Sequence, residues 1–71
     1  MSKRHIENKV SVLRTQKGVT QEELALQVGV SRQTISALEK GHYTPSILLA
    51  LDIARFFKVS VEDIFNVVNE K

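Results

Sequence analysis

The three glycines of the chain constrain its fold more than any other feature, because each one follows a stretch in which apolar residues recur at helical spacing. Gly18, Gly29 and Gly41 therefore predict three helix ends. Two helix starts are marked separately by Thr20 and Ser60, each of which has an acidic residue three positions later, the spacing of a capping box. These signals together predict a series of short helices.

Two further start signals complete the series: Ser31 is a good N-cap, and Pro45 suits a first helical turn. The five expected helices cover residues 3–17, 20–28, 31–39, 45–57 and 61–68. Because no segment alternates steadily between apolar and polar residues, we expect an all-α fold, one compact five-helix domain over residues 1–71. The inward faces of these helices predict the core residues Ile6, Val10, Leu13, Leu24, Ala25, Val28, Ile35, Leu38, Ile47, Ala50, Leu51, Ala54, Phe57, Val61 and Phe65.

The composition argues against several classes of protein. There is no cysteine for a disulfide or a thiolate zinc site, and neither His5 nor His42 has a partner at metal-ligand spacing. No apolar run approaches the length of a membrane span. The sequence also has no Ser, His and acid set and no phosphate-cradling glycine loop, so we expect no enzyme, metal or cofactor, and a cytoplasmic location.

The charges of the chain are unevenly distributed. Residues 1–41 carry seven Lys or Arg against four acids, a balance of +3, whereas residues 52–71 carry three against four, a balance of −1. This polarity is expected if one end of the molecule meets phosphates and the other does not.

Residues 20–39 have the layout of a helix-turn-helix, two capped helices joined by a turn that contains Gly29. At about 100° per residue, one side of helix 31–39 is apolar and the other is polar and short. Arginine pairs with guanine and glutamine with adenine in the major groove, and a small apolar side chain contacts the thymine methyl. The predicted base-contacting residues are therefore those on the polar side, Arg32, Gln33, Ser36 and Ala37.

The segment TQEELALQVGVSRQTISALEKG resembles the helix-turn-helix of the Cro and phage-repressor family, in its compact single-domain form. The similarity extends over about residues 6–66, through Leu13-Arg14, the segment Tyr43-Thr44-Pro45-Ser46 and the closing residues 59–65. The resemblance implies a structural ion pair between Arg14 and Glu39. It also implies contacts to the DNA backbone by Gln21, Ser31, Thr34, Lys40 and Tyr43.

The chain departs from the family at Ala37, where several relatives have a longer polar side chain that reads a base. We therefore expect one direct contact fewer and a narrower specificity. The resemblance implies a prokaryotic, sequence-specific transcriptional regulator, a repressor associated with the nucleoid. It would place helix 31–39 in the major groove of double-stranded DNA.

A single recognition helix gains only about 1–3 kcal/mol of discrimination from each bidentate contact, so we expect a homodimer on a palindromic operator. Helices 45–68 offer the interface, through apolar residues partly outside the predicted core: Leu48, Phe56, Ile64, Val67 and Val68. The same residues are alternatively an extension of the core. A second hypothesis uses this surface differently, in an antitoxin or protein-interaction module that mainly engages a regulatory partner protein.

Overall fold

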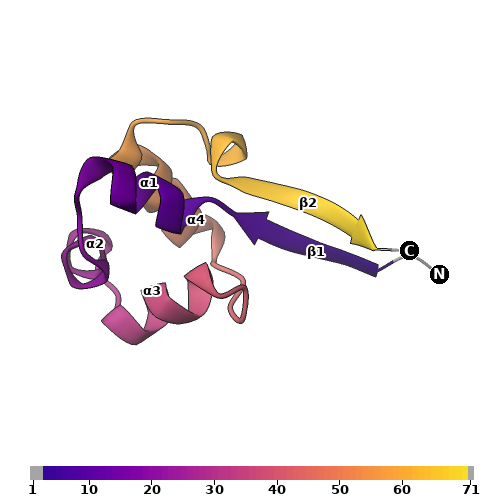
Figure 1. Ribbon diagram of the computed structural model, residues 1–71, viewed down its shortest axis with the longest axis horizontal. Coiled ribbons are helices and arrows are strands. Elements are labelled where there is room, and N and C mark those ends of the chain that lie inside the picture. Colours follow the sequence, from indigo (N-terminus) through magenta and orange to yellow (C-terminus); the bar gives the residue numbers. More distant parts are fainter. Residues whose placement is uncertain (1–2, 71) are drawn as a thin grey trace.

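The computed structural model describes residues 3–70, which form four α-helices and a two-stranded antiparallel sheet (Figure 1). The helices gather at one end of the molecule, and the sheet projects from them as a narrow ribbon with Lys3 and Glu70 paired at its tip. The order is β1 (Lys3–Asn8), α1 (Val10–Lys17), α2 (Gln21–Val28), α3 (Arg32–Glu39), α4 (Ile47–Phe57), the 3₁₀ turn η1 (Val61–Asp63) and β2 (Phe65–Glu70).

Local capping explains where the helices begin and end. The Thr20 hydroxyl accepts from the N–H of Glu23 while the Glu23 carboxylate accepts from the N–H of Thr20, so the capping box before α2 is complete. The Ser31 hydroxyl caps α3. The chain leaves α2 through Gly29, whose φ of 75° lies in the left-handed region that favours glycine. The start of α4 differs from the expected residue 45, because Ser46 is its N-cap.

The core lies between the four helices and η1. Its largest fully buried side chains are Val10, Leu24, Ile35, Leu38, Ile53 and Ile64. Three residues of the predicted core are exposed instead, namely Ile6, Ile47 and Leu51. The buried side of α4 consists of Leu49, Ile53 and Ala54. The side of this helix predicted to face the core was therefore displaced around the helix axis towards solvent.

The expected all-α, five-helix fold is wrong at both ends of the chain. Residues 3–8 form β1 rather than the first half of a helix, and the expected fifth helix is a single 3₁₀ turn followed by β2. The two strands pair with Ile6 opposite Val67 and Asn8 opposite Phe65. The β-branched residues of these segments favour a strand once a partner strand is present, and this partner is distant in the sequence.

Asn8 fixes the base of the ribbon to the helices. Its Nδ2 donates to the carbonyl oxygen of Leu38 at 2.9 Å, and its Oδ1 accepts from the N–H of Val10 at 3.1 Å. One side chain thus joins β1 to the start of α1 and to the last turn of α3. Within residues 3–70 no helix is long and apolar enough to cross a membrane.

Candidate nucleic-acid interface

Helix α3 has two distinct sides. Ile35 and Leu38 are buried in the core, whereas Arg32 and Gln33 in the first turn are exposed. Neither exposed side chain makes a hydrogen bond or an ion pair with another described residue. The apolar side of the helix therefore packs in the core, while the Arg32 guanidinium and the Gln33 amide face solvent and are available to bind another molecule.

Small side chains accompany these two residues. Ser36 and Ala37 are half-buried one turn further along α3, so no bulky group stands beside the exposed residues. Ser31 and Thr34 are partly occupied with each other, because their hydroxyl oxygens lie 3.0 Å apart and the Ser31 hydroxyl also caps the helix. A helix of about 10 Å diameter fits a major groove about 12 Å wide when its outward side is this narrow.

The structure brings Arg14, Gln21 and Glu39 together behind α3. Arg14 Nε donates to Glu39 Oε2 at 2.8 Å, and Gln21 Nε2 donates to Glu39 Oε1 at 3.0 Å. The Arg14 side chain is 18% exposed and that of Glu39 is 8% exposed, so the pair is largely screened from water. Arg14 also donates to the carbonyl oxygen of Val19. This network joins the C-terminal end of α3 to α1 and to the start of α2.

The electrostatics of this pair favour its charged form. The hydrogen bond from Arg14 to the Glu39 carboxylate raises the pKa of the guanidinium above its usual value, despite the opposing effect of desolvation. An open cleft of about 530 Å³ adjoins the network, between the starts of α2 and α3, and is lined by Arg14, Thr20, Gln21, Glu22 and Arg32.

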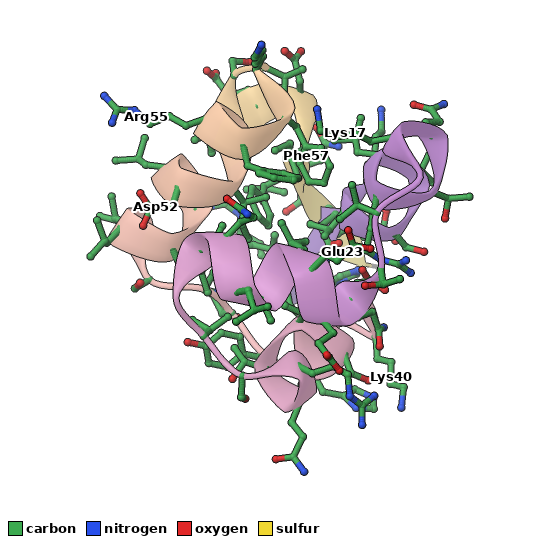
Figure 2. All side chains as sticks on the ribbon, turned by 90° about the vertical axis from the view of Figure 1, so that its left-hand side faces the viewer. Lys17, Glu23, Lys40, Asp52, Arg55 and Phe57 are labelled. Carbon is green, nitrogen blue, oxygen red and sulfur yellow. The ribbon has the colours of Figure 1, made fainter. Side chains whose placement is uncertain are left out.

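Two further predicted contact residues lie beyond the end of α3. Lys40 is exposed and points away from the helices at the lower edge of the molecule (Figure 2). Tyr43 is also exposed, on the loop to α4. Both follow α3 directly along the chain, in the segment that leads to α4.

The residues predicted for a dimer interface do not form one surface. Leu48 on α4 is 70% exposed and Val67 on β2 is 56% exposed, while Phe56 and Val68 are half-buried. Phe56 packs against the core and meets the ring of Phe57 edge-on. The placement of Ile64 in an interface is wrong, because its side chain is fully buried in the core of this chain.

Sequence reasoning missed Asn8, which holds the last turn of α3 through the carbonyl of Leu38. A signal was present, since asparagine is a preferred residue just before a helix and Asn8 precedes the first helical residue, Val10, by two positions. The two histidines lie apart: His5 Nε2 is 3.7 Å from Glu7 Oε2 on the ribbon, and His42 is exposed after α3.

These features are typical of a helix-turn-helix protein. Helix α3 is buried on its apolar side, exposed on its polar side, and held by the Arg14–Glu39 ion pair. A family model described as helix-turn-helix matches residues 12–64, and the chain therefore belongs to the helix-turn-helix family of the Cro and phage-repressor type. The resemblance found in the sequence is thereby confirmed.

Proteins of similar sequence are named as HTH-type transcriptional regulators. An uncharacterized HTH-type transcriptional regulator of Methanocaldococcus jannaschii is 55% identical over 60 residues, which cover 84% of this chain and 91% of the relative. The uncharacterized regulator YgzD of Bacillus subtilis is 52% identical over 60 residues, with the same coverage of 84% and 91%.

Solved structures are similar as well. The restriction-modification controller protein C.AhdI of Aeromonas hydrophila superimposes with a TM-score of 0.73 at 29% identity, covering 78% of this chain and 83% of that protein. The transcriptional regulator VanUg superimposes with a TM-score of 0.76 at 26% identity, covering 94% and 89%.

Proposed function

We propose that the protein is a sequence-specific DNA-binding transcriptional regulator that inserts α3 into the major groove. The observation that carries this proposal is the division of α3 into a buried side, with Ile35 and Leu38, and a front with the unpaired Arg32 and Gln33. Membership of the helix-turn-helix family and the names of its relatives support it.

The residues have distinct roles in this proposal. Arg32 donates to guanine O6 and N7 and Gln33 pairs with adenine, while Ser36 and Ala37 contact the adjacent base edges. The backbone phosphates are met by Gln21, Ser31, Thr34, Lys40 and Tyr43. Gln21 suits its role because its amide carries two hydrogens, of which one is bound by Glu39 and the other is left for a phosphate.

We further propose a homodimer on a palindromic operator, in which one surface lies on α4. Leu48, Leu51, Asp52 and Arg55 share one side of this helix, since they are spaced three or four positions apart. Figure 2 shows Asp52 and Arg55 on the outer side of α4, away from the other helices. Two-fold pairing of this side would bury Leu48 and set Asp52 of one copy against Arg55 of the other.

Such a dimer would act as a repressor by covering promoter DNA, which requires no surface beyond α3 and the dimer contact. It would work in the cytoplasm, bound to the nucleoid. Analytical sedimentation at tens of micromolar is expected to show a dimer, and Leu48→Asp is expected to give a monomer. A wild-type protein that stays monomeric both alone and on DNA would exclude this part of the proposal.

Selection of bound sequences from a random DNA pool tests the main proposal. The wild type is expected to enrich a palindromic motif containing guanine. Arg32→Ala should relax the preference at that position by about 1–3 kcal/mol, whereas Lys58→Gly, which removes a cation at the far end of α4, should leave it intact. A pool without any enriched motif would refute sequence reading. DNA reading predicts a salt-dependent affinity that Arg32→Ala abolishes, and the absence of both effects would favour the protein-interaction module instead.

A further inference from the structure

An open groove of about 720 Å³ lies beside the C-terminal end of α3. One wall is residues 4–8 of β1, and the other is formed by Lys40, Gly41, Tyr43, Thr44 and Pro45 on the loop after α3. In Figure 1 the ribbon projects past the end of α3, and β1 is the strand on the α3 side of the ribbon. The groove therefore continues the surface that α3 presents.

The charged groups that line this groove leave it cationic. They are Arg4, His5, Glu7, Glu39 and Lys40. Glu39 is engaged, because it accepts from Arg14 and Gln21, whereas Glu7 is an exposed acid whose Oε2 lies 3.7 Å from His5 Nε2 on the same strand. Arg4 and Lys40 make no ion pair or hydrogen bond through their side chains with the described residues. With Glu39 offset by Arg14, the two cations Arg4 and Lys40 outnumber the one remaining acid, Glu7, so the groove has a net positive charge with one cation on each wall, which favours an anionic occupant.

The unpaired cations on this side of the protein follow one another along its length. Arg32 begins α3, Lys40 follows its end and Arg4 lies further out on the ribbon. Helix α3 contributes about 12 Å to this row, at 1.5 Å per residue. The four steps along the strand from Asn8 to Arg4 contribute about 13 Å more, at 3.3 Å per residue.

A row of this length fits an extended polyanion better than a small one. The groove is open rather than enclosed, so a single phosphate ion would remain largely hydrated in it. A nucleic-acid backbone instead offers a charge about every 3.4 Å along each strand, and several of these meet the row at once.

We propose that the ribbon extends the DNA-binding surface, with Arg4 binding a backbone phosphate of the duplex beyond the base pairs that α3 reads. Lys40 and the Tyr43 hydroxyl contact the same stretch of backbone from the opposite wall of the groove. This proposal rests on the DNA-binding function proposed above and adds a contact that raises affinity for every sequence, because phosphates carry no sequence information.

The salt dependence of DNA binding tests the role of Arg4. The probe is a fluorescein-labelled duplex of about 30 base pairs and mixed sequence, titrated by anisotropy between about 50 and 200 mM salt. Loss of one phosphate contact per protomer in Arg4→Ala is expected to reduce the slope of log K against log salt by about 0.9 for each bound protomer. For each bound protomer, the loss of affinity over this salt range then becomes about threefold smaller than in the wild type.

Two variants control this measurement. Arg4→Lys keeps the positive charge and is expected to keep the wild-type slope. Lys58→Gly removes an exposed cation that follows α4 and does not line the groove, and it is expected to keep the slope too. Lys58 has a φ of 58°, a conformation that glycine adopts readily, so this control does not strain the backbone. The motif selected from a random pool should be the same for Arg4→Ala and the wild type.

The outcomes separate this proposal from the one on which it rests. A wild-type slope in Arg4→Ala, or an equal reduction in Lys58→Gly, overturns the ribbon contact while DNA binding itself stands. A wild type without salt-dependent binding overturns the DNA-binding function and the ribbon contact together. Equal melting temperatures of Arg4→Ala and the wild type show that the fold is intact, as expected for an exposed side chain.

Discussion

The helical body and the ribbon are stabilised in different ways. In the body, Leu24, Ile35 and Ile53 are completely buried, and each helix is fixed by contacts on its apolar side. In the ribbon, Ile6 is 39% exposed and Val67 opposite it is more exposed still, so the two strands are held mainly by their backbone pairing. A two-stranded sheet is marginally stable in water, and here only its base is attached to the body.

This difference indicates that the two regions have separate roles, the helical body in stability and, as proposed above, the ribbon in binding. Burial in the body sets the free energy of unfolding and the position of α3. The ribbon contributes little to the core beyond Phe65 at its base, and its Arg4 side chain is exposed to solvent. Substitutions at matched positions in the two regions should therefore have very unequal effects on stability.

The largest effect is expected for a core residue of α3. Ile35→Ala removes three carbons from a fully buried site and should lower the free energy of unfolding by about 2–5 kcal/mol, whereas the matched change Ile6→Ala on the ribbon should cost less than about 1 kcal/mol. The midpoints of urea denaturation measure both. Similar losses in the two variants would mean that the ribbon is as integral to folding as the body.

The second effect concerns the ion pair behind α3. Glu39→Ala leaves the Arg14 guanidinium, 18% exposed, without its carboxylate and should cost about 1–3 kcal/mol, less than for a fully buried pair. The matched ribbon variant, Glu7→Ala, removes an exposed acid and should cost no more than about 0.5 kcal/mol. The melting temperatures compare the two variants. An unchanged melting temperature in Glu39→Ala would show that the Arg14–Glu39 pair does not stabilise the fold.

The smallest effect is expected where the body passes into the ribbon. The N–H of Ser60 donates to the Asp63 carboxylate in the capping box of η1, and this lowers the pKa of Asp63 in the folded state. A lowered pKa stabilises the fold above the unfolded pKa, and this stabilisation is lost as the pH falls through the folded value. Asp63→Asn should therefore melt slightly below the wild type near neutral pH, and the difference should vanish in strong acid. If the difference in melting temperature between Asp63→Asn and the wild type grew as the pH fell, the Asp63 carboxylate would not be the stabilising group.

The body was largely predictable because its signals are local. Thr20, Ser31 and Gly29 mark the ends of α2 and α3 within a few residues of the helices that they bound. The periodicity of α3 alone separates the buried Ile35 and Leu38 from the exposed Arg32 and Gln33. The contact between Arg14 and Glu39 joins residues 25 positions apart, and only the family resemblance implied it.

The ribbon was not predictable from local signals. Residues 3–8 and 65–70 each become a strand because the other is present, and nothing within either segment identifies its partner. The capping box at Ser60 is real, but it starts only a 3₁₀ turn, since Asn66 and the β-branched Val67 and Val68 are poor helix formers. Ile64 was assigned to a surface for the same reason: its burial depends on where the chain turns after η1.

Pairing the first strand with the last also decides how the protein tolerates attachments. Lys3 lies opposite Glu70 in the register, so the first and last described residues meet at the tip of the ribbon (Figure 1). An affinity tag or a reporter joined before Lys3 therefore starts beside one joined after Glu70. Where a labelling site remote from the ribbon is needed, an internal loop, such as the one between α4 and η1, is the better choice.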